Sequence, residues 1–415
     1  RHVRMCRGTA CFVATGGCAD ESHLDGDPGG SASVQHVYCL GYCYAAPAAM
    51  DGATPVVGRP LIAANAVDRR EDVPVIPGRI TLTATSEQMR SDGLDMVEFT
   101  VSVTDPEGAV HDVTEYAEIY LDLQKTPLQS PVFSTDKDGD YLFYAVYGLS
   151  LSNELVITAF NDMPELPADP QEDNVSFSHR MLLIQHTGAT CVNCPRMMES
   201  LKKLSEDEDY SSLYHHVASH SYNGGEDDDA YSEAARNVSM AYNTSGLYPM
   251  LTYNLTTVAT GTDLSEIKAQ IDALRKDRAD VGIAASAKVS GNDVLVNVEV
   301  KAARENDYRV AAWLLEDGIY SLQAGMSESW HNTHDNALRY AAGAVSQFSF
   351  VGEKLGRLSE SEKAGKVFSI PMDDAWKAEN CEVLVFVTSA DENGNYDIAN
   401  CVLCPVGEAV TYDYL

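Results

Sequence analysis

The fold of this chain is decided by the stretch Gln185-His-Thr-Gly-Ala-Thr-Cys191-Val-Asn-Cys194-Pro195. It follows an apolar run over 181–184, which predicts a short buried strand, and it precedes a predicted helix over 195–204. Two cysteines at a strand-to-helix junction are typical of thiol–disulfide chemistry, because the amide groups at a helix N-terminus stabilise a thiolate. We therefore expect Cys191 to be the exposed, attacking cysteine, and Cys194, one turn inside the helix, to resolve the mixed disulfide.

Strands and helices alternate on the C-terminal side of this stretch. A strand-like pattern over 216–219 is followed by a predicted helix over 230–242, by a turn and strand over 246–253, and by an amphipathic helix that Asp263 caps. The alternation predicts an α/β domain over 179–280 with the C-x-x-C at its first βα turn. Tyr248-Pro249 comes at a turn before a strand, where a thioredoxin fold places a cis-proline loop beside the cysteine pair.

The flanking segments read as β-structure. Five runs that alternate with period two, over 80–85, 96–103, 116–121, 141–146 and 155–160, predict an immunoglobulin-like β-sandwich over 79–162, after a linker at 67–78. From 281 the pattern returns, with alternating valines at 294, 296, 298 and 300, and predicts a C-terminal β-sandwich over 281–415. The expected fold class is multidomain α+β.

These stretches carry a resemblance to a known family. The run Ile76-Pro-Gly-Arg-Ile-Thr-Leu-Thr-Ala84, the C-x-x-C stretch and the run Trp330-His-Asn-Thr-His-Asp-Asn-Ala-Leu-Arg339 together resemble the 28-kilodalton outer-membrane-protein (Omp) lipoproteins of Bacteroidetes, and 179–280 resembles a thioredoxin-like domain. The resemblance covers about 71–415. It implies an exported, surface-associated protein of the outer membrane or periplasm. Membrane attachment would come only from a lipid anchor that this stretch of chain does not contain.

Two functions follow for the C-x-x-C. In the first, Cys191 and Cys194, with Pro249 beside them, exchange disulfides with protein thiols. In the second, the pair is a resting structural disulfide on a scaffold used for adhesion or for binding surface ligands. Thr190 stands where many thioredoxins have tryptophan, and the sequence identifies no buried acid to accept a proton. No cofactor is expected for 71–415.

The N-terminal cysteines form a second constellation, Cys6-Arg-Gly-Thr-Ala-Cys11 and Cys39-Leu-Gly-Tyr-Cys43. Four thiolates with such spacings are typical of an iron–sulfur cluster. The motif resembles thioredoxin-like 2Fe–2S ferredoxins and the E-type subunit of NADH–quinone oxidoreductases, and this resemblance implies that Cys6, Cys11, Cys39 and Cys43 bind a 2Fe–2S cluster. Because only 27 residues separate the two pairs, we expect a partial ferredoxin-like segment over 1–66. It is either an electron-transfer module, which would suggest the cytoplasm, or a remnant without a cluster.

The charge distribution separates the two parts of the chain. The formal net charge is −33, but residues 1–70 contain six basic and six acidic residues, so the whole deficit lies in 71–415. Such a charge excludes nucleic acid as a partner, because phosphate binding requires clustered Lys and Arg.

Several other groups are expected to be structural. The acidic run 226–229 reads as a solvated cap at the start of the helix over 230–242. The residues His331, His334 and Asp335 read as a loop without a metal. Cys401 and Cys404 should face opposite sides of one strand, and Cys381 could pair with either through a neighbouring strand.

Overall fold

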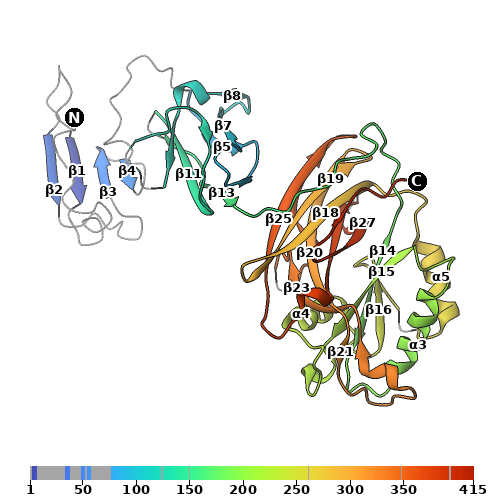
Figure 1. Ribbon diagram of the computed structural model, residues 1–415. Helices are drawn as coiled ribbons and strands as arrows, with labels where there is room; N and C mark the ends of the chain where they lie inside the picture. Colours follow the sequence, from blue (N-terminus) through green and yellow to red (C-terminus); the bar gives the residue numbers. More distant parts are fainter. Residues whose placement is uncertain are drawn as a thin grey trace. The chain divides into compact units, whose positions relative to one another are not determined.

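The protein is mostly β, with three α-helices among the described residues. The computed structural model describes residues 76–415 except 123, 125, 149, 260, 347, 392 and 393, together with the backbone of four strands nearer the N-terminus. The chain divides into two compact units, Arg1–Asn161 and Asp162–Leu415 (Figure 1). Within the described part of the chain, no helix has the length and apolar character needed to cross a membrane.

The four N-terminal strands form one sheet in the order β2-β1-β3-β4. They are β1 (His2–Cys6), β2 (Ser33–Val37), β3 (Ala48–Asp51) and β4 (Thr54–Val57). Because β1 and β2 run parallel, with Cys6 opposite Val37, their C-terminal ends lie at the same edge. Cys6 ends β1, whereas Cys11, Cys39 and Cys43 lie outside the described residues.

The rest of the first unit is a β-sandwich. All five strands predicted between 80 and 160 are confirmed, and four short strands join them. The strands are β5 (Arg79–Ala84), β6 (Gln88–Arg90), β7 (Val97–Thr104), β8 (Val110–Asp112), β9 (Glu118–Leu121), β10 (Val132–Phe133), β11 (Gly139–Tyr147), β12 (Ser150–Leu151) and β13 (Leu155–Phe160). One sheet has the order β10-β7-β5 and the other β12-β11-β13-β6. Val101 of β7 and Phe143 of β11 are fully buried between the two sheets, as period-two patterning requires.

The second unit is built around a nine-stranded mixed sheet in the order β17-β16-β14-β15-β23-β20-β26-β27, with β24 also paired to β20. Its strands are β14 (Met181–Thr187), β15 (Tyr214–His220), β16 (Met250–Tyr253), β17 (Thr257–Ala259), β20 (Asn306–Glu316), β23 (Ala337–Ala342), β24 (Glu353–Leu358), β26 (Cys381–Ala390) and β27 (Tyr396–Pro405). A second sheet, in the order β25-β19-β18-β28, contains β18 (Val281–Ser290), β19 (Asp293–Ala302), β25 (Lys363–Pro371) and β28 (Ala409–Val410).

The large sheet contains strands from two segments, 179–280 and 281–415, that the sequence pattern predicts as separate domains. Strands β14 to β17 come from 179–280, and β20, β23, β24, β26 and β27 come from 281–415. The connection is the parallel pairing of β15 with β23, in which Ala218 lies opposite Ala337 and its amide donates to the carbonyl of Asn336 at 2.8 Å. A single sheet therefore runs from the C-x-x-C region into the C-terminal sandwich.

Three helices cover the first part of this sheet. Helices α3 (Cys194–Ser205) and α5 (Leu264–Leu274) pack on the face that carries Met181 and Leu183, while α4 (Glu233–Tyr242) packs on the face that carries Leu182 and Ile184. Figure 1 shows α3 beside α5, with α4 apart from them. The predicted cap of α5 is confirmed, because the Asp263 side chain accepts from the amide of Ser265 at 2.8 Å.

Strands β20, β26 and β27 are buried on both faces. Alternate residues pack against the four-stranded sheet on one side and against α4, β14 and β15 on the other. Trp313 of β20 is fully buried on the second side, where its ring meets the rings of Phe350 and Phe386 edge-on, with centroid separations of 6.1 Å and 5.0 Å. These aromatic rings hold the centre of the second unit together.

Replacing Trp313 tests this packing. We expect Trp313→Ala to lower the free energy of unfolding of the second unit by about 3–5 kcal/mol, because it leaves a large cavity. Trp313→Phe should lower the free energy of unfolding clearly less. The buried indole N–H of Trp313 donates no hydrogen bond to a described residue, so phenylalanine loses none. The measurement is urea denaturation followed by far-ultraviolet circular dichroism. Val289→Ala, at a side chain that is 47% exposed, is the control and should change stability by less than about 0.5 kcal/mol. Equal losses for Ala and Phe would contradict the expectation.

Candidate functional site

The C-x-x-C lies where β14 ends and α3 begins. Cys191 and Cys194 form a disulfide with a Cα–Cα distance of 5.4 Å. The amide of Cys194 donates to the carbonyl of Cys191 at 3.2 Å, and Cys194 is the first residue of α3. Its sulfur is therefore next to the amide groups of the first helical turn, which lack partners within the helix and favour a negative charge.

Pro249 lies at the same edge of the sheet as the disulfide. The Tyr248–Pro249 peptide bond is cis, and the next residue, Met250, begins β16 opposite His186 near the end of β14. The hydroxyl groups of Tyr248 and Ser221 are 2.9 Å apart, and the amide of Ser221 donates to the carbonyl of Thr187 at 2.9 Å. The structure thus brings all three sequence-predicted residues of this site to one sheet edge.

The expectation that Cys191 is exposed is wrong. Cys191 is only 3% exposed, and Cys194 is fully buried. Residues 321–326, between β21 (Ile319–Tyr320) and the 3₁₀-helix η5 (Ser329–Asn332), lie against the backbone of this turn. The amide of Ala324 donates to the carbonyl of Ala189 at 2.7 Å. A covering segment more than a hundred residues away in sequence leaves no trace in the local pattern around the C-x-x-C.

Gln323 is the main contact of that covering segment. Its side chain is buried, and Nε2 lies 3.0 Å from the carbonyl oxygens of both Ala189 and Cys191. The backbone amide of Gln323 donates to Oδ1 of Asn332 at 2.9 Å. Gln323 therefore ties the turn before Cys191 to the C-terminal part of the chain. Its role has no sequence signal, because an isolated glutamine in a loop reads as a surface residue.

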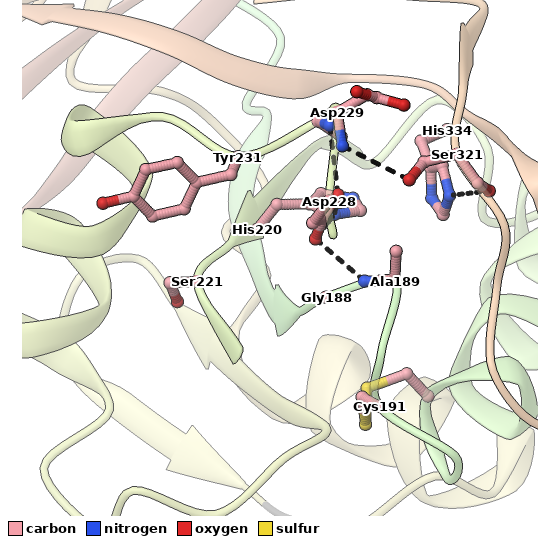
Figure 2. A network of polar contacts seen from close by, with 12 residues as sticks. Gly188, Ala189, Cys191, His220, Ser221, Asp228, Asp229, Tyr231, Ser321 and His334 are labelled. Carbon is pink, nitrogen blue, oxygen red and sulfur yellow. Dashed lines mark hydrogen bonds and ion pairs between the residues drawn. A yellow bond between two sulfur atoms is a disulfide. The ribbon is translucent and has the colours of Figure 1, made fainter. Parts of the chain in front are cut away.

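The acidic run 226–229 contains a buried carboxylate, so its interpretation as a solvated cap is wrong for Asp228. The Asp228 side chain accepts from the amide of Ala189 at 2.8 Å and from the amide of Ala230 at 3.0 Å, and it forms an ion pair with Nδ1 of His220 at 2.9 Å (Figure 2). The helix begins later than predicted, at Glu233, with Ser232 as its N-cap. A buried acid is thus present beside the C-x-x-C turn.

Electrostatics at this cluster favour an ionised Asp228 and a neutral His334. Burial raises the pKa of Asp228, but its hydrogen bond and ion pair with His220 outweigh burial and lower that pKa to about 2. The pKa of His334 is lowered to about 4, chiefly by burial and also by the neighbouring His220. His334 meets the ring of His220 edge-on at 4.7 Å, and its Nε2 donates to the carbonyl of Ser321 at 3.1 Å. Figure 2 shows His220 beside Asp228 and His334 beside Ser321.

The remaining described cysteines are buried free thiols. Cys401 and Cys404 pack on opposite faces of β27, which confirms the prediction from strand geometry. The suggested pairing of Cys381 with either of them is wrong, because all three are free. Burial raises the pKa of Cys381 to about 12 and that of Cys404 to about 11, so neither is a nucleophile near neutral pH.

Metal binding finds no support in the part of the chain that the structure describes, where no group of three His, Cys, Asp or Glu side chains is placed to hold an ion. His331 and His334 are buried and bonded within their own loop and to Ser321. The four N-terminal cysteines are not covered by this finding, because their side chains lie outside the described residues.

Comparisons with known proteins identify relatives of the C-terminal half. Residues 235–406 match the family model of the outer membrane protein Omp28. The chain is therefore similar to the Omp28 family from α4 to the end of β27, which confirms the predicted resemblance for this part. The matched residues do not include Cys191 or Cys194, and they do not include residues 1–66.

Two solved structures of proteins from Porphyromonas gingivalis are similar to parts of the chain. HBP35 of Porphyromonas gingivalis is 14% identical, with 56% of this chain and 77% of that chain covered and a TM-score of 0.46. A domain of the outer membrane lipoprotein Omp28 from the same organism is 18% identical. The similarity covers 31% of this chain and 88% of that domain, with a TM-score of 0.21. No curated protein matches the sequence of the chain.

The low pKa of His334 predicts an acid-sensitive second unit. A histidine in the unfolded chain has a pKa of about 6.5, whereas His334 in the folded protein has a pKa of about 4. Between these two pH values the unfolded chain binds a proton that folded His334 does not bind. The free energy of unfolding therefore falls as the pH drops from about 6.5 to about 4. The contribution reaches about 3 kcal/mol at pH 4. We expect His334→Gln to make this part of the profile of urea midpoint against pH less steep. Part of the slope should remain, because burial also lowers the pKa values of His179, His186, His215 and His216. His111→Gln, in the first unit, is the control. An unchanged profile in His334→Gln would contradict the assignment.

Proposed function

We propose that this protein resides in the cell envelope and exchanges disulfides with other proteins through Cys191 and Cys194. The observation that carries the proposal is the disulfide at the N-terminus of α3, on the sheet edge that also presents Pro249. Helix α3 supplies amide groups that stabilise a thiolate at this position. The location in the envelope is supported by the similarity of 235–406 to the outer membrane protein Omp28.

The exchange starts from the oxidised pair. A client thiolate attacks the sulfur of Cys191, the Cys191–Cys194 bond breaks, and Cys194 leaves as a thiolate. A second client thiolate then attacks the client sulfur of the mixed disulfide and releases Cys191. The client loses two electrons and two protons and becomes a disulfide, while the protein gains a dithiol. Asp228 stays ionised and holds the amide of Ala189, so it positions the turn before Cys191.

One observation favours a different function. Both cysteines are buried, which is typical of a structural disulfide, and the α/β part would then be a scaffold for binding surface ligands. The two functions differ in what happens on exposure to a thiol substrate, because a structural disulfide stays oxidised.

Cysteine variants separate these two functions. We expect the wild-type protein to oxidise a dithiol peptide stoichiometrically, with alkylation of Cys191 and Cys194 afterwards detected by mass spectrometry. Cys191→Ser should lower the rate at least a hundredfold. Cys194→Ser should accumulate a mixed disulfide at Cys191 with a disulfide-bearing peptide. Cys381→Ala removes a buried free thiol away from the site and should change nothing. A wild-type protein that leaves the peptide reduced would support the scaffold.

A second proposal concerns residues 1–66, which would hold a 2Fe–2S cluster through Cys6, Cys11, Cys39 and Cys43. It is supported by the parallel pairing of β1 and β2, because Cys6 ends β1 opposite Val37, the last residue of β2, and Cys39 comes two residues after Val37 in the sequence. Thiolate sulfur is the ligand that iron–sulfur clusters require. A bound cluster would supply one-electron transfer.

Absorption spectroscopy tests the cluster. Protein purified without oxygen should absorb visible light and release about two acid-labile sulfides per chain. Cys6→Ser should lower both signals severalfold, whereas Cys18→Ser, outside the motif, should leave them unchanged. Colourless protein without labile sulfide would contradict the proposal.

A further inference from the structure

The segment Ser321–Met326, here called the cover segment, lies along the backbone of the C-x-x-C turn as a bound peptide would. The amide of Ala324 donates to the carbonyl of Ala189, two residues before Cys191. Gly325 follows with φ of +73°, and a Cβ there would lie 2.3 Å from the carbonyl oxygen of Val192. Only a residue without a side chain allows so close an approach. The cover segment thus runs directly across the C-x-x-C turn.

Contacts on both sides keep the cover segment in place. At its beginning, the carbonyl of Ser321 accepts from His334, and the hydroxyl of Ser321 accepts from the amide of Asp229 at 3.2 Å. Beyond its end, Ser327 donates to Glu199 of α3 at 3.1 Å, and Lys202 of α3 lies 4.4 Å from the centre of the Trp330 ring. The chain from Ser321 to Trp330 therefore follows the C-x-x-C turn and then α3. In Figure 2 the ribbon that continues from Ser321 passes beside Ala189 and Cys191.

We propose that the cover segment holds the place of an extended, cationic client polypeptide, which must displace it to reach Cys191. This inference rests on the proposed exchange function for the identity of the client. The cover segment indicates what the client must provide: a backbone amide for the carbonyl of Ala189 and a small residue opposite Val192. Polypeptides bind in this way when an extended chain replaces an existing backbone partner.

Apolar and acidic side chains around the cover segment define the rest of the client. Val192, which lies outside the cover segment, is 64% exposed and offers apolar contact beside the disulfide. Asp227 and Asp229 are exposed, and the hydroxyl of Ser321 contacts the backbone of both residues. An acidic border of this kind attracts a client that carries Lys or Arg near its cysteine.

Displacement is favoured by an imperfect contact within the covered state. Oε1 of Gln323 is buried and receives no hydrogen bond from a described residue, although Nε2 of the same side chain is close to several carbonyl groups. A buried acceptor without a donor regains its hydration when it moves into water. The cover segment is therefore held by contacts that a client can replace, and Gln323 gains a water partner on leaving.

Variants of the cover segment test whether it limits access. We expect Gly325→Ala and Gln323→Ala to open the segment, so that a small phosphine reductant reduces the Cys191–Cys194 bond at least tenfold faster than in the wild type. Gly318→Ala is the matched control, because Gly318 has a similar φ of +71° but a Cβ there would come no closer than 3.7 Å to its nearest neighbour, Nδ2 of Asn380. Reduction is followed by alkylation and mass spectrometry of the full chain. Wild-type rates in both opened variants would overturn the inference.

Two dithiol peptides test the client. One carries lysines beside a Cys-Gly-Ala sequence, and the other carries glutamates at the same places. The lysine peptide should be oxidised at least tenfold faster by the wild type, the difference should shrink as salt is added, and both opened variants should oxidise it faster than the wild type does. Equal rates for the two peptides would overturn the client assignment. If the opened variants are reduced faster by the phosphine while no form oxidises either peptide, the exchange function fails and the covering role stands.

Discussion

The pairing of β15 with β23 is the constraint on which the second unit depends. It joins the strands that carry the C-x-x-C to the strands of the C-terminal sandwich, so that one sheet contains both. Because the central strands are buried on both faces, neither half can withdraw from the other without exposing apolar side chains such as Trp313. The same pairing brings the connections around β21 and β22 (Thr333–His334) next to the turn that leads into α3.

The disulfide is therefore part of a polar network assembled from distant segments. Ala189 is held from two directions, by the carboxylate of Asp228 at its amide and by the amide of Ala324 at its carbonyl. Almost every buried polar group of a folded protein needs such a partner, and these two bonds supply it for the residue that orients the C-x-x-C turn. The turn is consequently held in one arrangement, and access to its sulfur atoms depends on a segment that belongs to the C-terminal part of the chain.

Local sequence patterns predicted the elements well. The strands of the first sandwich, helix α3 and the Asp263 cap of α5 follow from short-range periodicity and capping chemistry, and so do the opposite orientations of Cys401 and Cys404. The exposure of Cys191 and the surroundings of Asp228 were predicted wrongly. The burial of Cys191 involves Gln323, which is 132 residues further along the chain. Asp228 is held by the amide of Ala189, 39 residues before it, as well as by His220, which is close in sequence but on the preceding strand.

The cysteine pair, the helix that follows it and the alternating strands can be predicted from the sequence, because each of these depends on the order of neighbouring residues. The similarity to the Omp28 family over 235–406 is also a property of sequence. The burial of Cys191, the buried and ionised state of Asp228 and the position of Ser321–Met326 along the C-x-x-C turn come from tertiary contacts. Burial and ion pairing depend on which surfaces pack against each other, and the strand order of the nine-stranded sheet determines that packing.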